Sequence, residues 1–177
     1  MKTEEYKGHT ITLEWEHDQD TESPWEHEDG HGPVTDWVTR DKRAGERVLV
    51  SDRRSRRYYD FAEAVKIAKR DGWGLHAKHI TELAAKLGRK PTKKEIIAES
   101  VERDFEYLRR WCNDDWYWCG YIVKIQGTNY HESLWGIDSD SQSDFESEAI
   151  GYAKRWLDSE LSENQDAACR DIETVST

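Results

Sequence analysis

Alternating apolar and polar positions mark the first recognisable element of the chain. In residues 10–16, Ile11, Leu13 and Trp15 alternate with polar side chains, the period of a strand with one solvated face. Further short segments of the strand-forming type follow at residues 34–39, 47–51 and 57–59. The pattern therefore predicts a small β-rich meander within residues 1–60.

Four later segments repeat apolar residues at helical spacing. They cover residues 61–71, 80–87, 92–112 and 143–157. Three of them begin with a capping arrangement, because Asp60, Thr92 and Ser143 each stand three residues before a glutamate. Gly72 and Gly88 follow the first two segments, and glycine is the residue most favoured at helix ends. We therefore expect about four helices.

A second strand pair is expected near the C-terminal end. Residues 116–125 are apolar on both faces except at Lys124, as in a central strand, and residues 132–137 are the hairpin partner. The predicted fold class is α+β, with small antiparallel β-sheets (an N-terminal meander and a C-terminal hairpin) packed with about four helices. One compact domain over residues 1–162 is expected, with a flexible tail at 163–177. Sub-units are suggested at 1–60 (β-rich), 61–112 (helical) and 113–162 (ββα).

The composition favours a folded protein in spite of its polarity. Charged residues make up 36% of the chain and the mean hydropathy is −1.01, but nine Trp and eight Tyr supply buried area that disordered chains lack. No run of eighteen apolar residues occurs, so we expect no membrane partner and a cytoplasmic location. Cys112, Cys119 and Cys169 have no framework spacing, which indicates reduced thiols, the first two as small core residues.

The charges are sorted into blocks along the chain. Residues 34–112 carry twenty basic and thirteen acidic side chains, whereas the flanks 1–33 and 113–177 carry six basic and twenty-four acidic ones. Carboxylates on a folded surface can imitate the phosphates of DNA and bind the positive groove of a DNA-binding enzyme, although acidity also simply favours solubility. The candidate partner-binding residues are Glu22, Glu26, Glu28, Asp29, Asp138, Asp140 and Asp144.

The basic stretch of residues 40–57 offers the opposite chemistry. With Tyr58 and Tyr59 beside it, it combines the phosphate-binding cations and stacking platforms that proteins use on single-stranded nucleic acid. The alternative is internal pairing of these cations with the acidic flanks. The candidate nucleic-acid-binding residues are Arg40, Arg43, Arg47, Arg53, Arg54, Arg56 and Arg57.

A loop rich in histidine and carboxylates is the candidate metal site. His17, His27 and His31 are the candidate ligands, because imidazoles and carboxylates in one loop can converge on Zn²⁺ or Mn²⁺ and support a metal-dependent enzyme. His27 and His31 are four residues apart, but Gly30 and Gly32 argue against one helix that presents both. A solvated loop with local hydrogen bonds is the favoured alternative, so no cofactor is expected.

No nucleotide-binding glycine loop, nucleophile elbow or kinase signature occurs in the sequence. Standard nucleotide-hydrolysing, serine-hydrolase and kinase activities therefore lack support. The chain is expected to act by binding rather than by catalysis.

Several segments resemble ones that recur in small, uncharacterised proteins of tailed bacteriophages and prophages. They are residues 57–60, 70–74, 114–121 and 132–140. The resemblance covers about residues 6–160 and implies no catalytic residues, since the family has no assigned activity. It implies a context, a phage or prophage accessory gene that acts in the cytoplasm of a host cell, rather than a mechanism. Small acidic proteins in that context often bind and block a host protein or nucleoprotein complex, so we expect binding of the anti-restriction or anti-CRISPR type.

Overall fold

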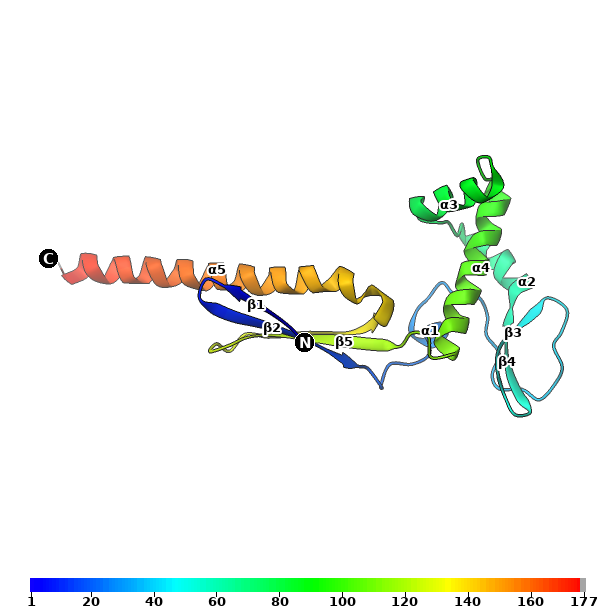
Figure 1. The fold of residues 1–177 in the computed structure, drawn as a ribbon, viewed down its shortest axis with the longest axis horizontal. Helices are drawn as coiled ribbons and strands as arrows, with labels where there is room; N and C mark the ends of the chain where they lie inside the picture. The colour runs from blue at the N-terminus through cyan, green and yellow to red at the C-terminus, as the bar shows by residue number, and fades with distance from the viewer. Residues whose placement is uncertain (176–177) are drawn as a thin grey trace. The chain divides into compact units, whose positions relative to one another are not determined.

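The chain forms two compact units. The fold is described from a computed structural model that gives the backbone of residues 1–175 and the side chains of residues 1–162. Unit 1 combines residues 1–21 with residues 117–177, and unit 2 is the continuous segment 22–116 (Figure 1). Unit 2 is thus inserted into the sequence of unit 1. The expectation of a single domain over residues 1–162 stays a prediction.

Unit 1 is an antiparallel sheet with one long helix. The sheet has the order β1-β2-β5-β6, and the helix α5 follows a short 3-10 turn. The bounds are β1 Lys2–Tyr6, β2 His9–His17, β5 Trp118–Ile125, β6 His131–Asp138, the 3-10 turn Ser139–Ser141 and α5 Gln142–Val175. The side chains of the predicted tail, residues 163–177, lie outside the described residues.

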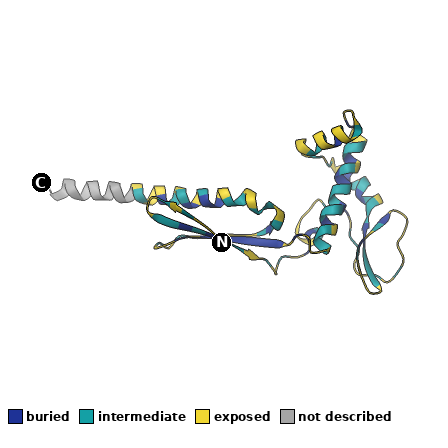
Figure 2. Cartoon of the chain, in the orientation of Figure 1, coloured by how far each residue is buried: buried dark blue, intermediate teal, exposed yellow. Residues whose placement is uncertain are grey.

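The core of unit 1 lies between α5 and one face of this sheet. Ile11, Leu13 and Val123 are at most 1% exposed, and they pack with Ala153 and Leu157 of α5. Buried residues accordingly line the side of α5 that faces the strands (Figure 2). The opposite face of the sheet is left without a covering helix in unit 1.

Unit 2 packs helices against a β-hairpin. Its elements are α1 Pro24–His27, β3 Glu46–Asp52, β4 Ser55–Asp60, α2 Phe61–Asp71, α3 Ala77–Leu87 and α4 Lys93–Cys112. The apolar stripe of α4, including Val101, Phe105 and Leu108, meets Tyr59 of β4 and Ala64 of α2 in one buried cluster. Helix α4 is therefore the central support of this unit. Within the described residues, no helix of either unit is long and apolar enough to cross a membrane.

Two of the three predicted helix caps are confirmed. The Asp60 carboxylate accepts a hydrogen bond from the Glu63 amide at 2.9 Å, and Thr92 forms a full capping box with Glu95. The third prediction is wrong, because Ser143 lies inside α5, which begins at Gln142 after the 3-10 turn. Glu146 pairs instead with Lys2 of β1 at 2.8 Å.

The α+β class is confirmed, but the predicted N-terminal meander is wrong. Strand β2 pairs with β1 and β5, while residues 34–39 form only two isolated bridges to β4. The strand over residues 118–125 lies in the sheet interior and needs a paired neighbour on each side, β2 and β6. That need for two neighbours brings distant segments together.

Candidate functional site

Unit 1 carries all of the net negative charge. Its residues include six basic and eighteen acidic side chains, a formal net charge of −12, whereas unit 2 has twenty basic and nineteen acidic ones. Residues 34–112 have an excess of seven positive charges, but unit 2 as a whole has an excess of only one. The difference comes from the acidic residues at 22–33 and 113–116, which belong to the same unit. The segregation that the sequence predicts therefore becomes an acidic unit beside a nearly neutral one.

Three ion pairs among the described residues lie on the side of unit 1 that faces α5. The pairs are Lys2 with Glu146, Lys7 with Asp158 and Lys154 with Glu4. Glu14 and Glu16 alternate with Leu13 and Trp15 along β2, so they lie on the opposite, uncovered face. Neither glutamate forms an ion pair with another described residue.

A hollow of about 610 Å³ lies at the end of β2. It is lined by His17, Asp18, Gln19, Asp20, Thr21 and Trp135. The Asp18 carboxylate accepts hydrogen bonds from the Thr21 hydroxyl at 2.7 Å and from the backbone amides of Asp20, Thr21 and Gly136. The Thr21 hydrogen bond, with help from these amides, lowers the pKa of Asp18 below its ordinary value. Asp18 is therefore an ionised carboxylate, held in place by hydrogen bonds, in the lining of the hollow.

Exposed aromatic rings accompany these carboxylates. The side chains of Trp135 and Tyr117 are 43% and 45% exposed, and the Tyr117 ring meets the His17 ring edge-on at 4.7 Å between centroids. Trp135 lies against Gly120, where a Cβ atom would come within 2.3 Å of the indole. Glycine at position 120 is therefore what lets the indole lie flat on the strand.

This combination suits a cationic partner. Carboxylates attract Lys and Arg side chains, and indole and phenol rings bind guanidinium groups over their faces. Trp and Tyr are also the residues that most often anchor protein interfaces. Glu16 pairs in register with Gly120, the residue that Trp135 covers, so it lies near the indole at the end of β2. We call the surface formed by Glu16, His17, Asp18, Asp20, Tyr117 and Trp135 the acidic–aromatic surface.

The structure divides the predicted acidic residues between the two units. Glu22, Glu26, Glu28 and Asp29 belong to unit 2, and Asp138, Asp140 and Asp144 belong to unit 1. The latter three flank the start of α5, where negative charge also stabilises the helix, and Asp138 accepts a hydrogen bond from Ser141 at 2.9 Å. The acidic–aromatic surface contains none of the seven.

The predicted arginines fall into two groups. Arg40 pairs with Glu46, and Arg47 pairs with Glu102 at 2.8 Å while lying over the Phe61 ring. The hydrogen bonds from Arg40 lower the pKa of Glu46 to about 2. Arg40 and Arg47 thus form internal ion pairs, but their partners Glu46 and Glu102 lie in unit 2 and not in the acidic flanks. The candidates that form no ion pair with a described residue are Arg43, Arg53, Arg54, Arg56 and Arg57.

The three candidate metal ligands are not brought together. His17 belongs to unit 1, and the other two belong to unit 2. Residues 27–31 carry the letters His-Glu-x-x-His of a zinc-protease helix, but α1 ends at His27, Glu28 is extended and Gly30 has a φ of 97°. Within the described part of the chain, no three His, Cys, Asp or Glu side chains gather into a metal site.

His31 instead belongs to a buried hydrogen-bond network. Its Nδ1 lies 2.5 Å from one oxygen of Asp104, whose other oxygen accepts from the Tyr59 hydroxyl at 2.6 Å and the Gly32 amide at 2.8 Å. The Tyr59 ring occupies the space that a Cβ atom at position 32 would need. Asp104 was missed by the sequence analysis, although an acid between Val101 and Leu108 on the apolar stripe of α4 was a usable signal.

The two described cysteines have unreactive thiols. Cys119 is fully buried in unit 1, and burial raises the pKa of its thiol. Cys112 is half-buried at the end of α4, and burial raises its thiol pKa to about 11. Both are therefore protonated near neutral pH, as small core residues are, while the side chain of Cys169 lies outside the described residues.

Comparison with known proteins finds no relative: no protein-family model, curated protein or solved structure matches this chain.

Proposed function

We propose that the protein acts by stoichiometric binding to a basic surface of another protein, through the acidic–aromatic surface of unit 1. The observation that carries this proposal is the net charge of −12 in unit 1, placed beside the exposed rings of Tyr117 and Trp135. The proposal assigns no catalytic residue. The phage resemblance supports a partner among host defence or nucleic-acid enzymes.

The physical basis is electrostatic complementarity. An acidic unit steers a basic partner and speeds its association, and aromatic anchors then slow dissociation. Glu14 and Glu16 form no ion pair with a described residue, so a partner's Lys or Arg side chains can pair with them. Because nucleic-acid enzymes expose such cations to phosphates, the same carboxylates compete with DNA for that surface.

The test compares two charge reversals of equal size. Glu16→Lys with Asp20→Lys changes the acidic–aromatic surface, whereas Asp41→Lys with Asp52→Lys changes exposed acids of unit 2. Each protein is immobilised and offered DNA-binding proteins from a bacterial host, and the retained partner is identified and titrated. We expect the first variant to bind that partner at least tenfold more weakly and the second to bind normally.

A DNA duplex added to the complex should release the partner, since both ligands use the same basic surface. Equal loss of binding in the two reversal variants would reduce the effect to net charge alone and contradict the proposed surface. Retention of the partner by the Glu16→Lys, Asp20→Lys variant would contradict it as well.

A further inference from the structure

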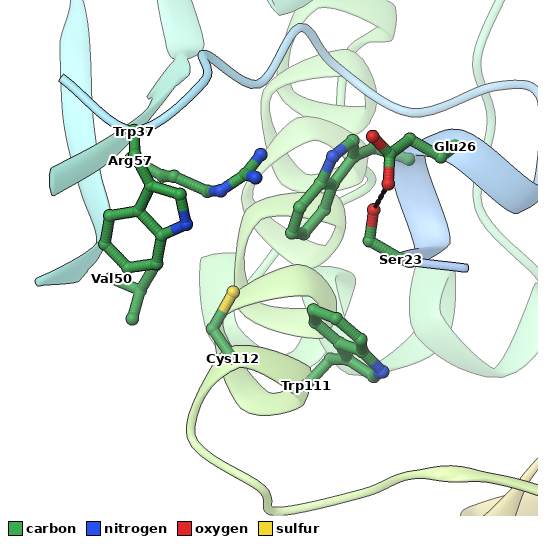
Figure 3. A pocket seen from close by; sticks show the side chains of 8 residues that line it. Ser23, Glu26, Trp37, Val50, Arg57, Trp111 and Cys112 are labelled. Atoms are coloured by element: carbon green, nitrogen blue, oxygen red, sulfur yellow. Dashed lines mark hydrogen bonds between the residues drawn. The ribbon is translucent and has the colours of Figure 1, made fainter. Parts of the chain in front are cut away.

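Unit 2 contains a second surface with different chemistry. A pocket of about 360 Å³ opens between the end of α4, helix α1 and the β3–β4 hairpin (Figure 3). Three indoles line it, those of Trp25, Trp37 and Trp111, together with Arg57, Val50 and Cys112. Glu26 lines it as well, and its carboxylate accepts a hydrogen bond from the Ser23 hydroxyl. The volume lies in the range of small-molecule sites and accommodates one planar heterocycle.

The guanidinium group of Arg57 is held by the indoles. It lies 5.4 Å from the ring centroid of Trp25 and 5.5 Å from that of Trp37, both within cation–π distance. Its one hydrogen bond is a long one of 3.4 Å to the Thr35 carbonyl, and it forms no ion pair with a described residue. Several N–H groups of Arg57 are therefore free to meet an anion.

The exposed ring is Trp37. Its side chain is 45% exposed, while Trp25 and Trp111 pack edge to face at 5.4 Å between centroids. Trp37 does not belong to the buried cluster of unit 2, so burial does not explain its position. An indole face open to solvent beside a fixed guanidinium is a stacking platform for a flat ring.

The charge around the pocket selects the kind of ligand. A cationic ligand is disfavoured at the rings, because Arg57 already lies over the Trp25 and Trp37 indoles. Arg53 and Arg54 are exposed at the turn of the same hairpin, and Arg56 lies next to Arg57 on β4. None of these three forms an ion pair with a described residue, in contrast to Arg40 and Arg47. Because these arginines outnumber Glu26, the carboxylate of the pocket lining, a ligand that combines flat rings with several negative charges fits this site best.

We propose that unit 2 binds single-stranded nucleic acid, with one base stacked in the pocket of Trp25, Trp37 and Trp111 and the adjoining phosphates on Arg57 and the hairpin arginines. Aromatic platforms flanked by unpaired cations are the general means of holding a single strand. A duplex does not fit this site, since its bases are stacked on each other. The site shares no residue with the acidic–aromatic surface, so each proposal stands or falls alone.

The test uses a fluorescein-labelled 12-nucleotide single strand of mixed sequence, as DNA and as RNA, and anisotropy of the full chain. The same sequence as a duplex and a 12-residue poly-glutamate peptide are the competing ligands. We expect the single strands to bind more tightly than either. Trp37→Ala should weaken binding about tenfold or more, because one stacked base is lost.

Charge removal provides an independent measurement. Arg53→Gln with Arg54→Gln should reduce the slope of log K against log salt by about 1.4, since each phosphate contact on a single strand contributes about 0.7. The matched control is Trp135→Ala, an exposed indole of unit 1 that should leave oligonucleotide binding unchanged. Conversely, Trp37→Ala should leave binding of the basic partner protein unchanged.

Three results would overturn the inference. They are affinity for the peptide or the duplex equal to that for the single strand, unchanged binding in Trp37→Ala protein that retains its circular dichroism spectrum, and a salt slope that the arginine variant does not alter.

Discussion

The two units use similar side chains for opposite purposes. In unit 2, many arginines and glutamates form ion pairs, some between different segments and some within α4. Examples are Arg40 with Glu46, Arg47 with Glu102, Arg89 with Glu95, Arg103 with Glu82 and Glu99, and Arg109 with Glu106. In unit 1, three pairs fasten β1 and its turn to α5, and most other carboxylates face solvent. Many charged side chains of unit 2 therefore stabilise its fold, whereas many carboxylates of unit 1 remain exposed and can bind a partner.

The units also differ in how the chain builds them. Unit 2 is a continuous segment, whereas the sheet of unit 1 joins β2 to β5 across an insertion of about a hundred residues. Each unit has its own buried cluster, the first around Leu13 and Val123 and the second around Val101 and Leu108. Separate cores imply that a defect in one unit leaves the other folded.

The largest expected effect tests that separation. Leu13→Ala and Leu108→Ala each remove a side chain with no exposed area, and each should lower the unfolding free energy of its own unit by about 2 to 5 kcal/mol. Hydrogen exchange measured residue by residue would locate the loss. Protection lost equally in both units by either variant would show that the two cores unfold together.

The next effect concerns buried charge in unit 2. Asp104→Asn leaves His31 and Tyr59 without a carboxylate partner and should destabilise unit 2 by about 3 kcal/mol, as expected when buried polar groups lose their hydrogen bonds. Asp144→Asn, the same change at an exposed position of unit 1, should alter stability by less than about 0.5 kcal/mol. Urea unfolding of both variants measures the difference, and similar midpoints would contradict it.

A smaller effect is expected where Trp135 crosses β5. Gly120→Ala places a Cβ atom 2.8 Å from the Leu134 carbonyl oxygen as well as against the indole, so it should cost about 1 to 3 kcal/mol through overpacking. Because the ring must move, affinity for the basic partner should fall while oligonucleotide binding is retained. Thermal unfolding and the two binding assays check this. Normal affinity for the partner would show that Trp135 does not contribute to the interface.

The smallest expected effect depends on pH. Burial alone lowers the pKa of His31, but the hydrogen bond and charge of Asp104, with Glu28 3.5 Å from Nε2, outweigh it and raise the pKa above the ordinary 6.5. Since the folded protein then holds the proton more tightly, this contribution to stability is full below pH 6.5 and is lost as the pH rises through the folded-state pKa.

The measurement is the unfolding free energy of unit 2 between pH 5 and pH 9, together with an NMR titration of the His31 ring. In Asp104→Asn protein the folded-state pKa should fall, so the decline in stability should diminish. If the unfolding free energy of that variant declines as much with pH as that of the unchanged protein, a titratable group other than His31 causes the decline.

Local patterns in the sequence predicted most elements of the fold. Asp60 and Thr92 predicted helix starts because a cap needs only residues three positions apart. The alternation of Ile11, Leu13 and Trp15 predicted β2 because the period of a strand is local too. Pairing is not local, which is why the partner of β2 was assigned to the wrong segment.

Two kinds of feature escaped the sequence analysis. Strand β1, with the sequence Lys-Thr-Glu-Glu-Tyr, has no apolar alternation, because it lies at the sheet edge and is joined to α5 by ion pairs. The indole pocket joins Trp25, Trp37, Arg57 and Trp111, which are too far apart in sequence to form a motif. The acidic–aromatic surface likewise joins residues 16–20 to Tyr117 and Trp135, which are about a hundred positions further along the sequence.

The insertion of unit 2 between β2 and β5 has a consequence for how the protein is made. A ribosome releases residues 22–116 before it has synthesised β5, β6 or α5, so unit 2 can complete its fold while β1 and β2 still lack their partners. During that interval Ile11 and Leu13 have no helix to cover them. Unit 1, although it contains the segment made before unit 2, closes after unit 2 has been synthesised.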